Sequence, residues 1–404
     1  MIEDIKKFTA EIEQEIINIR RHLHQNPELS GEEHKTAEYI SNILTKNSIK
    51  HELTVLEAGP VVIAEIHKSS ELKTIAFRAD MDALPLIECT DKPYCSKAHG
   101  VMHACGHDFN VASVLGTAII LNKIKDKIDL NIKFIFQPKE EKSESGAKAI
   151  VKAGLIKNID AIWAIHAYPC LEAGKIGIRY GVTTASADIF EIEVIGKGGH
   201  SARPHQCIDS IYIMNKIIND FYSEISRKFD PIKPVIFTVG QITGGTAANI
   251  ISEKCKCTGT VRTFEESIRK ELMVYINKKA SETAALYGAT THINWTYGPP
   301  SVINDEKLAS ITEKTATELI GASNTVILNE PSMGAEDFAL YLEQTPGVLL
   351  RIGTGGNDCH HPLHSCYFDI NEHSIPVTIN LLSFIAVSYS LKFSNTEIAI
   401  PNTQ

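Results

Sequence analysis

Short apolar runs alternate with helix-like segments through the first 170 residues of this chain. Residues 61–66, 74–77, 131–136 and 161–165 have the length and composition of buried strands. Residues 1–48 are expected to form two helices, and residues 110–125 a third. Strands that alternate with helices are typical of a sheet with mostly parallel strands and helical cover. The sequence therefore predicts an α/β domain.

Polar side chains follow three of these predicted strands. Asp80 and Asp82 come after the second run, Glu140 and Glu141 after the third, and His166 after the fourth. Open α/β sheets bind their ligands at the carboxyl ends of the strands, so we expect these groups to lie close together. One of the adjacent glutamates can bind a metal ion while the other acts as a general base. Taken alone, the two glutamates are equally well interpreted as a solvated charge pair beside lysines.

The segment Met102–Asp108, MHACGHD, concentrates ligands of transition metals. Cys105 and His107 are two residues apart, so in an extended segment their side chains leave on the same side. With Glu141, His166 and His364 they make a mixed set of sulfur, nitrogen and oxygen donors, typical of a hydrolytic metal site. Cys105 acting as a nucleophile beside His107 is the alternative, and the surplus of further donors favours metal. Asp108 is expected to cap the following helix.

The pattern changes near residue 184. Residues 188–194 alternate between apolar and polar, and strands and helices then follow in the order β-α-β-β-α-β up to residue 296. This order predicts a small ferredoxin-like α+β domain. We assign residues 185–297 to this inserted domain, and residues 1–184 and 298–404 to a discontinuous catalytic domain.

Composition narrows the class of protein. A length of 404 residues favours two domains. The net charge of -9, with acidic and basic residues interspersed, argues against nucleic acid and anionic membranes as partners. The N-terminus has no apolar signal core, and no uninterrupted apolar run reaches the length of a membrane span. Nine scattered cysteines suit reduced thiols, so a cytoplasmic enzyme is expected.

Ten segments, spread over nearly the whole chain, resemble one known family. The chain resembles the metal-dependent aminoacylase/carboxypeptidase superfamily, and most closely its N-acyl-amino-acid amidohydrolase branch, which includes hippurate hydrolases and auxin-conjugate hydrolases. The segments are, in order, RRHLHQNPELS, FRADMDALP, MHACGHD, QPKEE, AIHAYP, GKGGHSARPH, GGTAANII, GTVRTF, MGAEDF and LHSCYFD.

The resemblance implies roles for individual residues. It implies a dinuclear metal site held by Cys105, His107, Glu141, His166 and His364, with Cys105 in the bridging position. Glu140 aligns with the general base and Asp82 with an acid that supports the metal site, while Asp80 stands where other branches have a ligand histidine. His200, Asn249 and Arg262 of the inserted domain align with residues that contact substrate or polarise its carbonyl. On spacing alone, His200 would be an incidental residue of a glycine-rich loop.

The activity implied is hydrolysis of the amide bond of N-acyl amino acids, of acetyl or benzoyl type, by metal-activated water. The alternatives are a carboxypeptidase or dipeptidase, or a deacetylase of an N-acetyl-diaminopimelate-type compound, using the same site. A metal-binding scaffold without activity is disfavoured because Glu140 and every aligned ligand are present. The ions expected are two of Zn, Mn, Co or Ni. The oligomeric state stays open between a monomer and a homo-oligomer formed through the inserted domain.

Overall fold

The computed structural model describes residues 1–356 and 358–394, and contacts divide the chain into two compact units. The first comprises Met1–Gly181, Ile303–Glu330 and the chain from Leu340 onward. The second comprises Val182–Val302 and Pro331–Ala339. The sequence-based boundaries assigned 331–339 to the catalytic domain, whereas this segment packs with the second unit: Ser332 accepts a hydrogen bond from Ala185 and bridges to Thr184.

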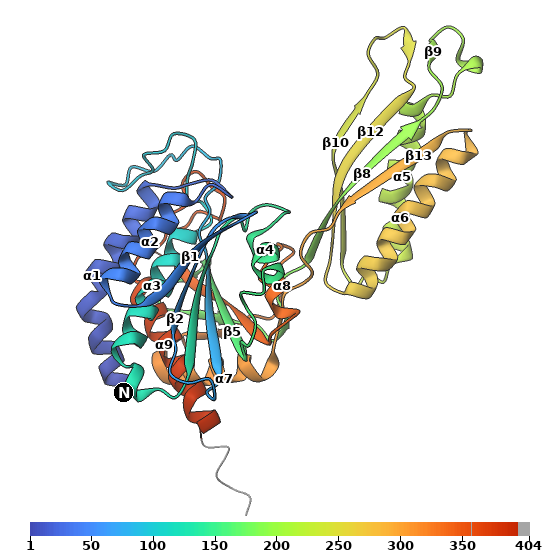
Figure 1. Ribbon diagram of the computed structural model, residues 1–404. Helices are drawn as coiled ribbons and strands as arrows, with labels where there is room; N and C mark the ends of the chain where they lie inside the picture. The colour runs from blue at the N-terminus through green and yellow to red at the C-terminus, as the bar shows by residue number, and fades with distance from the viewer. Residues whose placement is uncertain (357, 395–404) are drawn as a thin grey trace, which may run out of the picture. The chain divides into compact units, whose positions relative to one another are not determined.

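The first unit contains an eight-stranded sheet in the order β1-β2-β4-β3-β5-β16-β6-β15 (Figure 1). Its four central strands, β4, β3, β5 and β16, run parallel to one another, and antiparallel pairs occur at β1-β2, β2-β4 and β16-β6. The strands are β1 (Lys50–Leu56), β2 (Gly59–Ile66), β3 (Thr74–Asp80), β4 (Asn131–Gln137), β5 (Ala161–Glu172), β6 (Ile176–Ile178), β15 (Thr325–Ile327) and β16 (Gly347–Gly355). The predicted α/β class with a mostly parallel central sheet is confirmed.

Helices cover this sheet, and their apolar side chains pack with those of the strands in the main hydrophobic core of the first unit. They are α1 (Ile2–Gln25), α2 (His34–Lys46), α3 (His107–Lys123), α4 (Gly146–Lys152), α7 (Glu306–Ile320) and α9 (Ser374–Ser394). Helices α1, α3 and α9 pack against one another, and α1, α2 and α3 lie side by side in Figure 1. Helix α3 is buried over almost its whole circumference, which is why its sequence shows no polar face. The short elements β7 (Gly181–Val182), β14 (Ile303–Asn304) and α8 (Ala339–Leu342) lie where the chain passes between units.

Helix α9 is long and apolar enough to cross a membrane by length and composition, with a mean hydropathy of 1.5 over Ser374–Lys392. However, 78% of that window is buried inside the protein. Its residues pack on α1, α3 and α7, as those of a central core helix do.

The second unit is a two-layer sandwich with a separate core. Its sheet has the order β10-β12-β8-β13, with every neighbouring pair antiparallel, and its two helices cover one face (Figure 1). The elements are β8 (Ser186–Ile195), α5 (Ser210–Lys228), β10 (Val235–Gly244), β12 (Lys254–Thr263), α6 (Glu266–Leu286) and β13 (Thr290–Thr296), with a separate two-stranded antiparallel sheet of β9 (Gly199–His200) and β11 (Ile250–Ile251). This is the predicted ferredoxin-like arrangement, and Cys255 and Cys257 of β12 lie in its core.

A buried network of ion pairs holds α1 against the rest of the first unit. The fully buried Arg20 lies 2.8 Å from Asp108 Oδ2 through Nε and 2.7 Å from Asp369 Oδ1 through a terminal nitrogen. Burial alone would lower the pKa of Arg20, but Asp108 and Asp369 outweigh it and raise that pKa, so Arg20 stays charged. The network therefore links three segments that are far apart in the sequence.

Arg20→Met should destabilise the protein strongly because it leaves two buried carboxylates without their cation. We expect a loss of about 3–5 kcal/mol in the free energy of unfolding measured in urea. The neighbouring Arg21 is the matched control, because its pair with Glu372 is partly exposed. Arg21→Met should cost about 1 kcal/mol or less. Equal losses from the two variants would show that the buried network does not carry this stability.

Candidate metal centre

Three neighbouring parallel strands bring the polar groups to one edge of the sheet. Strand β3 ends at Asp80 opposite Gln137, the last residue of β4, and it pairs on its other side with β5. Glu140 and Glu141 follow β4 within four residues. His166, expected at the end of its strand, instead lies inside β5, which continues to Glu172 because β16 pairs with it beyond the point where β3 ends.

Gly106 shapes the turn that carries Cys105 and His107. Its φ of +83° is in the left-handed region, and a Cβ there would lie 2.7 Å from the Cβ of Ala167. Glycine alone satisfies both constraints, so the turn can approach β5 closely. The turn is tied to a distant loop as well, since the backbone N–H of His364 donates to the carbonyl of Ala104 at 2.8 Å.

The predicted capping role of Asp108 is wrong. The N-cap of α3 is Gly106, and Asp108 lies in the first turn of the helix. Its Oδ2 is 2.8 Å from both Arg20 Nε and His24 Nδ1. His24 is therefore part of a buried polar network behind the turn.

The five predicted ligands come together. Donor atoms of Cys105, His107 and His166 lie within 4.8 Å of one another, and so do those of Cys105, Glu141 and His364. The Cys105 Sγ is 3.4 Å from His166 Nε2, and His364 Nε2 is 3.2 Å from Glu141 Oε1. Cys105 belongs to both groups, as a donor between two ions would. A third group, of His107, Glu140 and Glu141, places Glu140 beside the cluster.

Hydrogen bonds to the outer ring nitrogens orient two of the imidazoles. His107 Nδ1 lies 2.8 Å from the carbonyl of Asp82, and His166 Nδ1 lies 2.8 Å from the carbonyl of Ala167. A carbonyl oxygen only accepts, so each Nδ1 carries the proton and each Nε2 faces the cluster. Among the described residues, the buried His107 Nε2 has no hydrogen-bond partner. Such a buried nitrogen is costly unless it has a ligand, and it fits a metal ion.

The cluster favours charged forms. Burial raises the pKa of the Cys105 thiol, but His166 and His107 outweigh it and lower that pKa to about 6. Burial lowers the pKa of His107, while Asp80 and Cys105 raise it well above its usual value. For His364, hydrogen bonds with Cys105 and Glu141 raise the pKa to about 10. The anionic groups thus hold protons on the imidazoles, in positions where a divalent cation could replace them.

Asp82 and Asp80 support the cluster through different partners. Asp82 Oδ2 accepts from Ser30 Oγ at 2.7 Å and from the backbone N–H of Glu141 at 3.0 Å. Asp80 accepts from Arg78 and from Asn110 Nδ2, each at 2.7 Å, and lies 3.8 Å from His107 Nε2. Asn110 thus donates to the acid that the resemblance places at the position of a ligand histidine.

The second unit separates its three predicted substrate residues. His200 in β9 pairs with Ile250 of β11. Ser201, which follows His200, donates its N–H to the carbonyl of Asn249 at 3.1 Å, so His200 and Asn249 are close. Arg262 lies eight residues along β12 from Lys254, about 26 Å at a rise of about 3.3 Å per residue. The β9–β11 pair adjoins the Lys254 end of this sheet, because β11 ends three residues before Lys254. His200 and Arg262 therefore lie at opposite ends of the unit.

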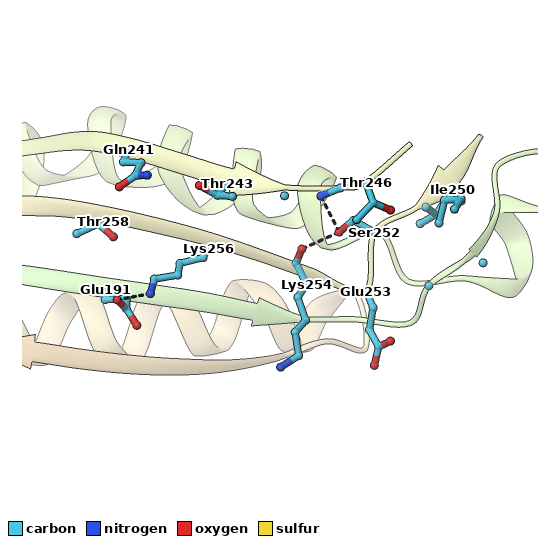
Figure 2. Close-up of a pocket in the computed structure, with 15 residues that line it drawn as sticks. Glu191, Gln241, Thr243, Thr246, Ile250, Ser252, Glu253, Lys254, Lys256 and Thr258 are labelled. Atoms are coloured by element: carbon cyan, nitrogen blue, oxygen red, sulfur yellow. Dashed lines mark hydrogen bonds and ion pairs between the residues drawn. The ribbon is translucent and has the colours of Figure 1, made fainter. Parts of the chain in front are cut away.

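A groove of about 940 Å³ lies on the uncovered face of the four-stranded sheet, beside the β9–β11 pair. Figure 2 shows Glu191, Lys256 and Thr258 on the strands that floor it, with the helices behind. Glu191 forms an ion pair with Lys256, and Ser252 bonds to Lys254 and the glycine-rich loop. The lining is polar and already satisfied by internal pairs, so the donor-rich cluster of the first unit is the stronger candidate for chemistry.

Sequence reasoning missed several supporting residues. Ser30 and Glu33 precede or begin α2, and their side chains reach Asp82 and the loop after β4. The only sequence signal for Glu33 is an acidic residue at a helix start, a common feature. Long-range contacts decide its role.

An α/β unit with thiol, imidazole and carboxylate donors gathered at its strand ends has the architecture of a metal-dependent hydrolase. The chain belongs to peptidase family M20/M25/M40, whose model matches residues 76–387. The resemblance noted in the sequence is therefore confirmed.

Individual relatives cover most of the chain. It is 39% identical over 302 residues to the N-acyl-L-amino acid amidohydrolase of Geobacillus stearothermophilus, covering 75% of this chain and 81% of that protein. It is 39% identical to the N-acetyl-L-cysteine deacetylase of Bacillus subtilis, covering 90% and 85% respectively. Among solved structures, the YXEP protein of Bacillus subtilis, described as a dinuclear metal-binding peptidase, matches with a TM-score of 0.83, 34% identity and coverage of 95% and 99%.

In the metal-free protein, the Cys105 thiol should ionise at a midpoint near pH 6, because His166 and His107 stabilise its thiolate. Below that pH it is a thiol and above it a thiolate. Ultraviolet thiolate absorbance followed against pH should show this step, and Cys105→Ser should remove it. Cys257→Ser is the control, because burial raises the pKa of Cys257 to about 12. A step that persists in Cys105→Ser would contradict the assignment.

Proposed function

We propose that this protein hydrolyses the amide bond of N-acyl amino acids with acetyl-type or benzoyl-type acyl groups. The observation that carries the proposal is the shared position of Cys105 in two donor groups, with Glu140 next to the second group's Glu141. The printed activities of the amidohydrolase and deacetylase relatives support this substrate class. The substrate must present a scissile amide to Glu140 and the donor cluster together.

We propose that Cys105, His107, Glu141, His166 and His364 hold two divalent ions, with Cys105 between them. The protonated Nδ1 atoms of His107 and His166 keep each Nε2 directed at the cluster. Bound divalent ions would polarise the amide carbonyl and acidify a water molecule. A mixed set of sulfur, nitrogen and oxygen donors suits zinc, and manganese, cobalt or nickel are the other ions to assay.

Glu140 acts as the proton carrier in this proposal. Its carboxylate accepts a proton from the attacking water and delivers it to the nitrogen of the leaving amine. Asp82 supports this step from behind, because it binds the backbone N–H of Glu141 and lies beside His107 Nδ1. The carboxylate of Glu141 remains available to the cluster.

A carboxypeptidase activity is the second candidate. The chain is 37% identical to the thermostable carboxypeptidase 1 of Saccharolobus solfataricus, covering 97% of this chain and all of that protein. A panel of acetyl- and benzoyl-amino acids and dipeptides, assayed with each metal, separates the two. Faster hydrolysis of dipeptides would favour the carboxypeptidase.

We place the protein in the cytoplasm, supported by its nine free cysteines.

His200, Asn249 and Arg262 are proposed to contact substrate. An N-acyl amino acid is about as long as three residues of extended chain, roughly 10 Å. This length is much shorter than the span from the β9–β11 pair to Arg262. One copy cannot place both ends of this unit on one such substrate. We therefore propose that the protein acts as a homo-oligomer, in which a second copy supplies His200.

Glu140→Gln should bind metal normally and lose turnover by about 10²–10⁴-fold, because the amide cannot accept the proton. Metal content and kcat are measured together. Glu144→Gln, on an exposed part of the same loop, is the control and should keep full activity. A chelator should abolish wild-type activity, and added metal should restore it. Wild-type kcat in Glu140→Gln would exclude Glu140 as the base, and chelator-resistant activity would point to Cys105 as a nucleophile.

Mixing two inactive variants tests the shared site. Glu140→Gln and His200→Ala should each be inactive, and mixed subunits should recover up to about a quarter to a half of the wild-type activity after exchange. Recovery follows because one mixed site then has both residues intact. A monomeric protein in light scattering, or no recovery after confirmed exchange, would contradict this arrangement.

A further inference from the structure

The residue just before the proposed base has an unusual backbone conformation. Lys139 has a φ of +55°, in the left-handed region that lysine rarely adopts. Its carbonyl accepts a hydrogen bond from Gly146 at 3.0 Å, which closes the loop after β4. Such strain persists only where surrounding contacts enforce it, and it often marks a functional segment. The conformation of Lys139 sets the direction in which the chain enters Glu140.

A buried carboxylate from a distant segment holds this conformation. Glu33 is completely buried at the start of α2, and its side chain does not cap that helix. Instead, its Oε1 accepts the backbone N–H of Lys139 at 2.8 Å. Both oxygens also lie within 3.0 Å of the N–H of Gly31. A carboxylate is rarely buried without strong hydrogen bonds, and here the donors are the backbones of two loops.

The space around Glu33 is closely fitted. A Cβ at Gly59 would lie 3.2 Å from Glu33 Oε2 and also 3.2 Å from the Cβ of Pro138. Gly59 itself has a φ of +123°, so its missing side chain and its backbone both suit this contact. Gly59, at the start of β2, therefore packs closely against both the Glu33 carboxylate and Pro138, the residue before Lys139. Its position is fixed from several sides.

A second carboxylate holds the other end of the same turn. Asp82 accepts the N–H of Glu141 at 3.0 Å, while Glu33 accepts the N–H of Lys139. Lys139 and Glu140 lie between these two anchored peptide groups, and the peptide group that joins them is held by the hydrogen bond from Gly146 to the Lys139 carbonyl. Fixing the peptide groups on both sides restricts the directions in which the Glu140 side chain can leave the backbone.

We propose that Glu33 is a positioning residue that holds Lys139 in its left-handed conformation and thereby aims the Glu140 carboxylate at the donor cluster. The orientation of Glu140 toward substrate rests on the proposed function. The clamp on Lys139, which is the hydrogen bond from its N–H to Glu33, does not. Among the described residues, Glu33 belongs to none of the donor groups. Its removal acts through geometry, and an error of about 1 Å in the position of a reacting group can cost about 10²-fold in rate.

Glu33→Gln tests the clamp directly. The variant keeps the size of the side chain but replaces one acceptor oxygen with an amide group opposite backbone N–H donors. We expect kcat to fall by about 10–100-fold, with KM and bound metal unchanged within twofold. Glu32→Gln, at the exposed neighbouring position, is the control and should behave as wild type. Should Glu33→Gln fold poorly, Glu33→Asp keeps the carboxyl group but shortens the reach and should show the same split between kcat and KM.

Lys139→Gly supplies a rescue that a general structural role would not predict. Glycine adopts the left-handed conformation without the steric cost of a side chain. Lys139→Gly alone should stay within about threefold of wild type. In combination with Glu33→Gln it should recover kcat about tenfold over Glu33→Gln alone. Loss of activity that tracks Tm and is not rescued would overturn the proposal.

Amide hydrogen exchange of the metal-free protein provides a readout that needs no activity. The Lys139 N–H should be protected in wild type and exchange at least tenfold faster in Glu33→Gln. If this loss of protection occurs but wild type hydrolyses no acylated amino acid or dipeptide, the clamp stands and the proposed function fails. If wild type is active and Glu33→Gln has unchanged protection and kcat, the clamp is wrong.

Discussion

The alignment of three parallel strands is the constraint on which the rest of the centre depends. Backbone pairing sets Asp80 opposite Gln137 and Arg78 opposite Ala164, so β4, β3 and β5 present their carboxyl ends side by side. Glu140 and Glu141 then need only a short loop to reach the cluster, and His166 lies in β5 itself. The segment of Cys105 and His107 makes a longer approach, which depends on Gly106, because this residue has no side chain to collide with Ala167.

Concentrating so many ionisable groups has an electrostatic cost that the surrounding structure offsets. Burial alone would keep Cys105, Asp82 and Glu141 neutral, yet nearby imidazoles and backbone N–H groups favour their charged forms. Behind the turn, Arg20 and His24 neutralise Asp108 in the same way. The centre therefore consists of an inner set of donors and an outer set of counter-charges. The outer set comes from α1 and the loops, which explains why the N-terminal helix is part of a site located at the sheet edge.

Local patterns predicted most of the elements, because strand alternation and helix periodicity are written in neighbouring residues. The order β-α-β-β-α-β expected up to residue 296 is the order of the six main elements of the second unit. Predictions failed where a distant partner decides. His166 is inside its strand because β16 pairs beyond β3, and Asp108 lies within the first turn of its helix, where its second oxygen binds the distant Arg20. Glu33 had no usable signal, since its partner is 106 residues away. The ligand set was found because the residues of a metal site must be of a few types, whereas their supporting partners can be many.

The two carboxylates around Glu140 show how such a site tolerates strain. A turn with Lys139 in the left-handed region is unfavourable by itself, and each bonding carboxylate is unfavourable to bury by itself. Joined, the carboxylates satisfy the N–H groups that the turn exposes, and the turn supplies the donors that the carboxylates need. Each cost is offset by the other, so neither Glu33 nor the turn can be understood as a separate feature. The same reasoning accounts for the glycines at 31 and 59, because a side chain at Gly59 would meet the Glu33 carboxylate and Pro138, and the left-handed φ of both residues favours glycine.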